Sequence, residues 1–408
     1  MDTFIQTLTF PSSALLAVSF LLGAIALHRY AHGRMIVKVL GSIRTARILL
    51  IVGAIMLAVE GTWSVPLHHS FVFTLYVAVL LLSLTTTLLN GIRKKARAGF
   101  LLNHLGIFII LWSALFGAPD VKRSKMMVGR EQPMNFSYTA DGLITPLPFQ
   151  VTLEDFRIDY YPDGKSPRQF TSSLIVGGEK MEVAVNHPGT YKGYTIYQDS
   201  YDWEAGRYTV LQLVHDPWLP LVYLGMALLA AGSLLLLFSK WKAKLVVPVT
   251  LALTAFFTIL TVAKINFGTL MPALRSWWFV PHLFIYMLAY SLMAMSLVAW
   301  LAGSWKQKEE WQVLSNHFMR SSSALLIIGM LTGSIWARQA WGDYWAWDPK
   351  ENWAAATWLL SLMHLHLQNK RGWKAITILI LAFLALQITW YGIHYLPSAM
   401  DSLHTYNR

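Results

Sequence analysis

Residues 98–117 read AGFLLNHLGIFIILWSALFG, a run of twenty residues that contains no Lys, Arg, Asp or Glu. About twenty apolar residues in a helix are enough to cross the hydrocarbon core of a bilayer, so this run predicts a membrane-spanning helix. The whole chain has the same character, since 55% of its 408 residues are hydrophobic and 13% are charged. Its mean hydropathy is +0.45. This composition excludes an ordinary soluble protein.

Nine further apolar runs of similar length lie on either side of this one. We therefore predict an all-α polytopic membrane protein with about ten transmembrane helices. The predicted spans are residues 11–28, 45–60, 70–90, 98–117, 218–239, 245–263, 277–302, 321–337, 353–368 and 374–391.

The distribution of Lys and Arg predicts how the chain is oriented. With the amino terminus outside, the five inner loops hold 18 of the 33 basic residues and the short outer segments hold five. The positive-inside rule then places both termini and residues 118–217 outside a bacterial cytoplasmic (inner) membrane. The net charge of +12 is thereby explained without a nucleic-acid partner. No basic residue precedes the first apolar run, which we expect to be a retained span and not a cleaved signal.

The chain contains no cysteine, so its outer segment has no disulfide although an oxidising compartment would permit one. Two interpretations stay open. Many envelope proteins simply lack cysteine, or thiol chemistry takes place on a partner and a resident thiol would interfere. The second interpretation adds thiol-reducing proteins to the expected partners.

Residues 118–217 differ in composition from the rest of the chain. Alternating patterns at 149–161, 170–176, 179–185, 191–201 and 207–214 predict strands, with turn residues between them. We expect a small β-rich extracytoplasmic domain on a helical membrane base. The predicted domains are residues 1–117, 118–217, a pair of linking membrane helices at 218–263, and 264–408.

The densest chemical signal is the segment 336–353, WARQAWGDYWAWDPKENW. It interleaves Trp341, Trp345 and Trp347 with Asp343, Asp348 and Glu351. Such a surface suits a flat apolar ligand with polar edges. The alternative is an interfacial aromatic belt, because tryptophan favours the headgroup level of a bilayer.

Four histidines lie where a purely structural role is hard to supply. His104 and His366 fall inside predicted spans near their inner ends, and an ionisable group at such a depth indicates a functional site. His282 and His404 lie at the outer side, near the level of the tryptophan segment. The alternatives are hydrogen bonds to a neighbouring helix for the first pair and unliganded interfacial histidines for the second. Imidazole suits several metals, but two axial imidazoles beside indoles indicate haem.

The segment WGDYWAWDPKENWAAATW, residues 341–358, resembles the tryptophan-rich WWD signature of haem-handling proteins, in the WDPKE form of the CcsA branch of System II cytochrome c biogenesis. PALRSWWFVPHLFIYMLAYSL (272–292) and SLHTY (402–406) resemble the segments that carry this family's two outer histidines. HLGIFIILWSALFG (104–117) and NHPGTYKGYTIYQDSYD (186–202) resemble CcsB, also called ResB. The chain thus looks like a compact fused CcsB–CcsA (ResB–ResC) cytochrome c synthase.

The resemblance implies that residues 1–117 are CcsB-like and that residues 264–408 form a CcsA-like WWD domain. It implies that His282 and His404 are axial ligands of haem b at an outer site, and that His104 and His366 receive haem from the inner side. Trp341, Trp345 and Trp347 would pack along the macrocycle. The residues expected to bind the cofactor also include Asp348 and Glu351, which we expect to fix the segment by hydrogen bonds. The residues expected to act in catalysis are His282, His404 and Asp348.

The implied activity is transport of haem across the membrane and its attachment, through thioether bonds, to CXXCH motifs of apocytochrome c. This would make the chain a holocytochrome c synthase (cytochrome c haem lyase), with haem, apocytochrome c and membrane lipid as partners. For the haem propionates, the nearest basic residues in sequence are Arg338, Lys350 and Arg275. Three alternatives remain: a haem transporter or chaperone without ligation, a membrane b-type electron carrier, and a bare structural scaffold.

Overall fold

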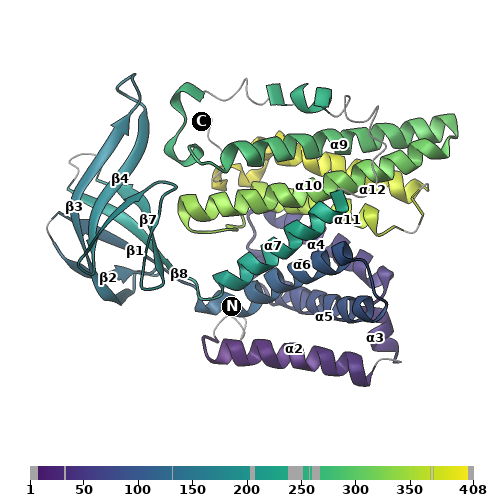
Figure 1. Cartoon of the computed structure of the whole chain (residues 1–408), viewed down its shortest axis with the longest axis horizontal. Helices are drawn as coiled ribbons and strands as arrows, with labels where there is room; N and C mark the ends of the chain where they lie inside the picture. The colour runs from purple at the N-terminus through teal and green to yellow at the C-terminus, as the bar shows by residue number, and fades with distance from the viewer. Residues whose placement is uncertain are drawn as a thin grey trace.

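A bundle of roughly parallel helices carries a β domain at one end (Figure 1). This computed structural model describes residues 8–31, 34–130, 132–202, 207–237, 251–256, 258–259, 267–367, 369–370 and 372–402. Of the predicted site residues, His404 lies outside the described residues. We call the end of the bundle next to the sheet the β-domain end and the opposite end the distal end.

The long helices pack side by side (Figure 1). They are α2 (Ser12–Tyr30), α4 (Ile43–Trp63), α5 (Phe71–Arg93), α6 (Ala98–Gly117), α7 (Leu219–Leu237), α9 (Phe279–Lys306), α10 (Glu309–Trp341), α11 (Pro349–Leu365) and α12 (Trp373–Trp390). Shorter helices join them: α3 (Met35–Leu40), η1 (Leu67–His69), η2 (Ala118–Asp120), η3 (Phe267–Thr269), η4 (Pro272–Leu274), η5 (Gly392–Tyr395) and η6 (Pro397–Asp401).

Among the described residues, seven helices are long and apolar enough to cross a membrane, namely α2, α5, α6 with η2, α7, α9, α10 and α12. The chain is therefore a multi-pass membrane protein, while the predicted count of ten spans is not confirmed. Two other predicted spans form helices of the bundle, but α11 has only 17 residues and α4 carries Arg44, Arg47 and Glu60. The predicted span 245–263 lies largely outside the described residues.

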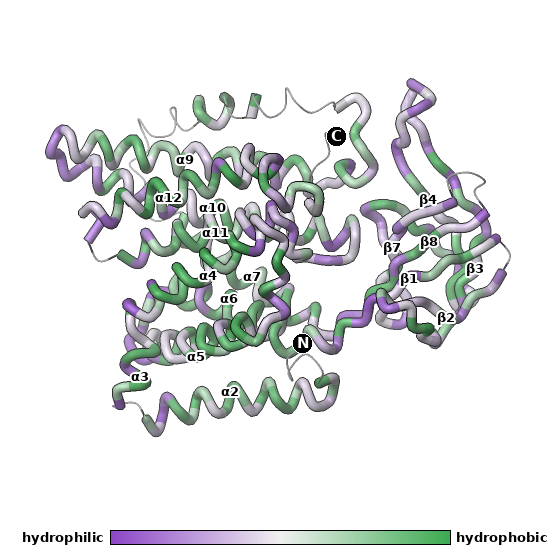
Figure 2. Tube along the Cα trace, turned by 180° about the vertical axis from the view of Figure 1, so that it is seen from behind, coloured by the Kyte–Doolittle hydropathy of each residue, from purple (hydrophilic) through white to green (hydrophobic). Residues whose placement is uncertain are grey.

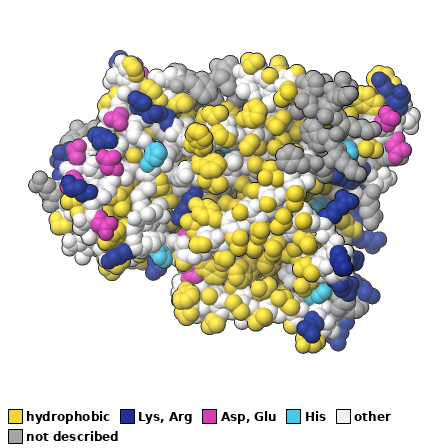
Figure 3. Space-filling model, viewed as in Figure 1, with side chains coloured by type: hydrophobic (Ala, Val, Ile, Leu, Met, Phe, Trp, Pro, Cys, Tyr) yellow, Lys and Arg dark blue, Asp and Glu magenta, His cyan; other side chains and the backbone are white. Residues whose placement is uncertain are grey.

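The surface of the bundle matches a lipid environment. Apolar residues run along the helices in Figure 2, and apolar side chains cover the middle of the bundle in Figure 3. Large aliphatic side chains such as Leu22, Ile55 and Val72 are exposed. Lys and Arg gather at the distal end in Figure 3, whereas the β domain mixes acidic and basic side chains. This is the charge asymmetry expected of a membrane protein whose distal end faces the cytoplasm.

Helices α6 and α7 pack closely because glycine faces glycine between them. A methyl group on Gly106 would lie 2.5 Å from the backbone nitrogen of Leu229 and 2.8 Å from the carbonyl oxygen of Gly225. Gly225 in turn would bring a methyl group within 3.0 Å of the carbonyl oxygen of Gly106. Small residues let the two backbones approach, which is a common way to join helices in lipid.

The β domain is a single antiparallel sheet of eight strands in the order β5-β4-β3-β2-β1-β8-β7-β6. The strands are β1 (Lys122–Gly129), β2 (Met134–Tyr138), β3 (Ile144–Tyr160), β4 (Pro167–Val176), β5 (Glu179–Ala184), β6 (Gly189–Tyr191), β7 (Tyr194–Tyr201) and β8 (Tyr208–His215). A β-rich domain between the fourth and fifth predicted spans is thus observed. Its buried core includes Met126, Leu153, Leu174, Ile196 and Leu213.

Strands β1, β2 and β6 have no counterpart of their own among the predicted strands. In β1 the residues Lys122, Arg123 and Lys125 are exposed, while Met126 and Val128 are buried. Three cations in four positions made the strand resemble a polar linker. Its pairing with β8, from Lys122 with His215 to Gly129 with Tyr208, supplies the order that local propensity did not indicate.

Candidate functional site

The tryptophan segment is a short loop between two helices, and its sequence fixes both ends. Helix α10 ends at Gly342, whose φ of +90° is a left-handed conformation that suits glycine. Helix α11 begins with a capping box, in which Asp348 is the N-cap, Pro349 follows at the first position and Glu351 stands at the third. Residues 342–348 are thus held between two well-defined helix termini.

Two carboxylates hold this loop through backbone N–H groups. Glu351 Oε2 accepts from the nitrogens of Ala346 at 2.8 Å and Asp348 at 3.3 Å, and Asp348 Oδ1 accepts from the nitrogen of Lys350 at 2.7 Å. Both acids therefore accept hydrogen bonds from the backbone of the loop and of the first turn of α11. Asp348 is 4% exposed, so its carboxylate acts inside the protein and not at the surface.

The three predicted indoles divide into two groups. The ring of Trp341 lies 5.9 Å from that of Trp336, centroid to centroid, in a cluster at the start of the loop. Trp345 and Trp347 meet edge to face with centroids 6.2 Å apart. Trp347 has a φ of +58°, an uncommon backbone conformation for a bulky residue that turns its side chain toward the amino-terminal helices.

Those helices supply a histidine that sequence analysis did not select. The imidazole of His68, in η1, stacks on the indole of Trp347, and its Nδ1 is hydrogen-bonded to Glu60. Glu60 is 4% exposed near the end of α4. A sequence signal existed, because Glu60 is the only Asp or Glu between Asp2 and Asp120. A lone carboxylate in so long an apolar region indicates a buried polar partner.

The β domain rests against the opposite side of the loop. Gln212 of β8 donates to the carbonyl of Trp341 at 3.0 Å, and Arg123 of β1 forms an ion pair with Asp343. Burial raises the pKa of Tyr344 to about 12, so its hydroxyl stays protonated at neutral pH. A methyl group on Gly342 would lie 2.9 Å from Gln212 Nε2. The β domain and the tryptophan loop are therefore in direct contact.

The basic residues considered for the propionates already have contacts. Arg338 is buried and donates to the carbonyl of Gly342, the ammonium of Lys350 lies 5.6 Å from the centre of the Trp390 ring, and Arg275 donates to the carbonyl of Arg168 at 3.2 Å. A carbonyl carries no formal charge, so this contact does not neutralise Arg275.

His282 lies in the first turn of α9, at the β-domain end. Its Nδ1 is 2.8 Å from the carbonyl oxygen of Gly329 in α10, and its ring contacts Trp336 and Tyr286. Because a carbonyl only accepts, a neutral His282 carries its proton on Nδ1 and has its lone pair on Nε2. A methyl group on Gly333 would lie 2.6 Å from His282 Cε1, so the glycine makes room for the ring.

The segment that leads to His404 reaches the loop. Ser402 Oγ donates to Asp348 Oδ1 at 3.2 Å, and Ser398 Oγ donates to the carbonyl of Gly61 in α4 at 2.6 Å. The carboxyl-terminal segment thus contacts both the cap of α11 and the end of α4. His404 itself lies outside the described residues.

His104 and His366 come together at the distal end from different helices. His104, in α6, donates from Nδ1 to the carbonyl of Phe100 at 2.8 Å, and His366, at the end of α11, donates from Nδ1 to the carbonyl of Leu362 at 2.8 Å. The two residues lie close enough to interact electrostatically. Each bonds to its own helix and not to a neighbouring one, and each has its lone pair on Nε2.

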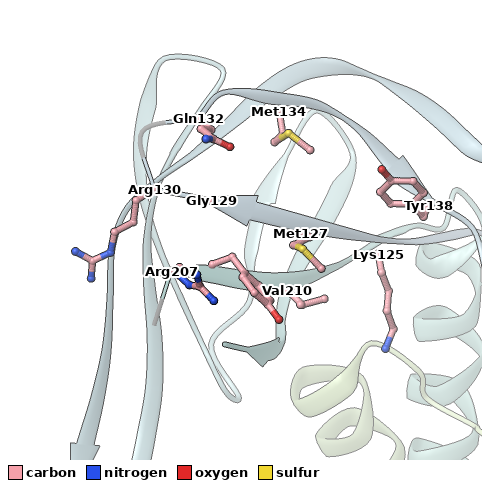
Figure 4. Close-up of a pocket in the computed structure, with 10 residues that line it drawn as sticks. Lys125, Met127, Gly129, Arg130, Gln132, Met134, Tyr138, Arg207 and Val210 are labelled. Carbon is pink, nitrogen blue, oxygen red and sulfur yellow. The ribbon is translucent and has the colours of Figure 1, made fainter. Parts of the chain in front are cut away.

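A cavity of about 700 Å³ lies on the β domain, away from these histidines, and Figure 4 shows its lining residues. Its three cations have acidic partners: Lys125 pairs with Asp199 at 2.8 Å, Arg130 with Asp155 at 3.0 Å and Arg207 with Asp202 at 3.2 Å. Met127 and Val210 supply apolar surface between them. The cavity is therefore close to charge-neutral.

Residues 218–400 match the family model described as Cytochrome C assembly protein, and residues 94–206 match the ResB-like family. The first match includes residues 218–263, which sequence analysis set apart as linking helices. The fold and these matches define a polytopic membrane protein of the cytochrome c assembly class. More particularly, the chain joins a ResB-like part to a CcsA-like part in one polypeptide, so the predicted fused CcsB–CcsA type is confirmed.

Similar proteins support the second part. The cytochrome c biogenesis protein CcsA of Chlamydomonas reinhardtii is 30% identical over 193 residues, which cover 44% of this chain and 55% of that protein. CcsA of Anthoceros angustus is 44% identical over 84 residues, or 21% of this chain and 25% of that protein. CcsA of Prochlorococcus marinus (strain AS9601) is 28% identical over 196 residues, or 38% and 63%. The chain thus spans a quarter to two thirds of the length of these relatives.

Proposed function

We propose that this chain takes up haem b at its distal end, carries it to the β-domain end and attaches it to the CXXCH motif of an apocytochrome c. The main support for the proposal is that three histidines make the same kind of hydrogen bond. His104, His366 and His282 each donate Nδ1–H to a backbone carbonyl at 2.8 Å. Histidines that bind metals through Nε2 are typically held in this way by the other ring nitrogen.

At the distal end, the two neighbouring imidazoles of His104 and His366 are suited to receive haem iron from the cytoplasmic side of a bacterial inner membrane. They come from the ResB-like and CcsA-like parts respectively. A complete site therefore requires both parts, which is a reason for joining them in one chain. The basic distal end supports the same orientation, with the β domain and both termini outside (Figure 3).

At the β-domain end, we assign His282 as one axial ligand and His404 as the other. The contact of Ser402 with Asp348 brings the carboxyl-terminal segment to the tryptophan loop. Trp341, Trp345 and Trp347 would supply apolar surface for the macrocycle. Asp348 and Glu351 would act by holding the loop, because their oxygens accept backbone N–H groups.

Attachment needs little covalent chemistry from the protein. Each cysteine S–H adds across a vinyl C=C bond of haem, so one S–C and one C–H bond form and no group leaves. The protein contributes by holding both reactants in position. Apocytochrome c would bring its own histidine, which can replace one of the two protein ligands as the product leaves.

Purified chain incubated with haem and a CXXCH peptide under reducing conditions tests the proposal. A thioether-linked product supports attachment. Haem that binds and transfers without a covalent product indicates a transporter or chaperone. Stoichiometric haem that never leaves indicates a b-type electron carrier, and a chain that stays colourless with haem supplied contradicts haem handling altogether.

A further inference from the structure

A second cavity, of about 430 Å³, opens at the distal end between α4, α11 and α12. Three cations line it, Arg44 and Arg47 from α4 and Lys374 from α12. Apolar side chains complete the wall, among them Ile48, Met363 and Trp373. We call this cavity the distal basic pocket.

The distal basic pocket is strongly electropositive. Its elements contribute no nearby carboxylate, because the sequence has no Asp or Glu from 3 to 59, from 61 to 119, or from 352 to 400. Among the described residues its cations form no ion pair. Arg47 Nε donates to the carbonyl of Ile43 at 3.2 Å, and the Lys374 ammonium lies 5.7 Å from the centre of the Trp373 ring.

A comparison with the β-domain cavity indicates the sign of the charge that a ligand of the distal basic pocket should carry. There each of three cations is matched by an aspartate, whereas here three cations face apolar walls with no acidic partner in the described part of the chain. Positive charge in surroundings of low polarity attracts anions more strongly than it does in water. The pocket therefore favours an amphipathic ligand with an anionic end and an apolar body.

The pocket adjoins the distal histidine pair. Met363 and Leu367, which line it, lie on either side of His366 along the chain. The charge of Arg47 acts on His366, and that of His366 acts on His104. A ligand whose anionic end occupies the pocket would thus have its body beside an imidazole that offers Nε2.

We propose that the distal basic pocket binds the propionates of haem as haem enters the protein. This inference rests on the proposed function and adds to it the groups that recognise the anionic edge. Arginine forks match carboxylates well, and the flat macrocycle suits the apolar wall. An anionic phospholipid offers a similar anionic head, but it would not make use of the adjoining histidines.

The test uses the full chain in phosphatidylcholine nanodiscs, titrated with metal-free protoporphyrin IX and with its dimethyl ester. A metal-free porphyrin does not depend on axial ligation, so binding reports the propionates alone. The pocket variant is Arg44→Gln, Arg47→Gln and Lys374→Gln. The control removes three distal cations outside the pocket, Lys38→Gln, Lys94→Gln and Lys306→Gln.

We expect the wild type and the control to bind the free acid roughly tenfold or more tightly than the ester, and the pocket variant to lose this preference. A pocket variant that still prefers the free acid as the wild type does would overturn the inference. So would a wild-type preference that vanishes when part of the phosphatidylcholine is replaced by phosphatidylglycerol, since the pocket would then be a lipid headgroup site. Attachment of haem to a CXXCH peptide is measured on the same preparations. A wild type that attaches none contradicts the proposed function, independently of the porphyrin result.

Discussion

The imidazole of His68 stacks on the indole of Trp347 with ring centroids 4.4 Å apart and planes 3° from parallel. The carboxylate of Glu60 is hydrogen-bonded to Nδ1 of the same imidazole. The amino-terminal helices thus support the tryptophan loop of the CcsA-like part directly. Close packing of α4 on α11 adds to this support, since a methyl group on Gly61 would lie 3.2 Å from the carbonyl oxygen of Pro349.

Removing the stacked ring should loosen the loop. His68→Ala should lower the free energy of unfolding by about 1 kcal/mol, the usual contribution of an aromatic pair beyond its buried area. Thermal melting followed by tryptophan emission measures this. His187→Ala, an exposed histidine of the β domain, is the control and should melt like the wild type. Equal melting of all three proteins would mean that the stack contributes nothing.

The outer ligands can be tested by absorption spectra. His282→Ala and His404→Ala should each lose the haem absorbance of the outer site or shift it toward mixed ligation, because one axial imidazole is gone. His317→Ala should keep the wild-type spectrum. Unchanged haem content and spectrum in all three proteins would show that the site is assigned to the wrong residues.

The distal pair should control how much haem reaches the other end. His104→Ala or His366→Ala should lower the haem found at the outer site while the amount of protein in the membrane stays normal. Haem per chain, measured in membranes from haem-replete cells, is the relevant quantity. A normal outer load in both variants would remove the entry role.

Asp348 serves as a helix cap, and substitutions can separate this role from a catalytic role of its negative charge. Asp348→Asn keeps an acceptor for the nitrogen of Lys350 and should keep stability and haem attachment close to those of the wild type. Asp348→Ala should lower the free energy of unfolding by about 1 kcal/mol. If Asp348→Asn folds normally and attaches no haem, the charge itself acts in catalysis.

Asp216 should make stability depend on pH. Burial raises its pKa above the ordinary value of 3.8, although the nearby charges of Arg338 and Arg123 act in the opposite direction. The folded chain therefore holds this proton more tightly than the unfolded chain. The contribution of Asp216 to the free energy of unfolding is therefore fully present below its pKa in the unfolded chain. This contribution is lost as the pH rises through its higher pKa in the folded chain.

Asp216→Asn should remove that loss. The substitution keeps an acceptor for the nitrogen of Trp218, which lies 3.0 Å from Asp216 Oδ1. We expect the variant and the wild type to melt alike at low pH and the variant to melt at the higher temperature at neutral pH. A wild type that is the more stable at neutral pH would mean that the two arginines outweigh burial.

Local features of the fold could be predicted from the sequence. The end of α10 at Gly342 and the start of α11 at Asp348 depend on residues close in the chain, and so does the span at 98–117. The role of Glu351 as a loop-fixing residue follows from the same capping pattern. Strand β1 could not be predicted, because its cationic residues do not favour a strand by themselves and the strand is ordered by its pairing with β8.

Long-range contacts account for what sequence analysis missed at the site. Nothing near His68 indicates that Trp347 will lie on its face, since the two residues belong to opposite ends of the chain. The distal basic pocket likewise joins α4 to α12, two elements that the sequence separates widely. His104 and His366 are predicted from their depth in apolar runs, and His282 and His404 from their place near the level of the tryptophan segment. Neither signal depends on knowing the partner residue.

The glycine contact of α6 with α7 has a consequence for the size of the protein. The chain leaves the bundle at the end of α6 and returns at the start of α7, and between these points β1 pairs with β8. The eight strands are therefore an insertion in a helical hairpin that is already closed beneath them. Such an insertion can be lengthened or shortened without any change in the membrane, so a compact chain can keep the same transmembrane hairpin as one with a much larger outer domain.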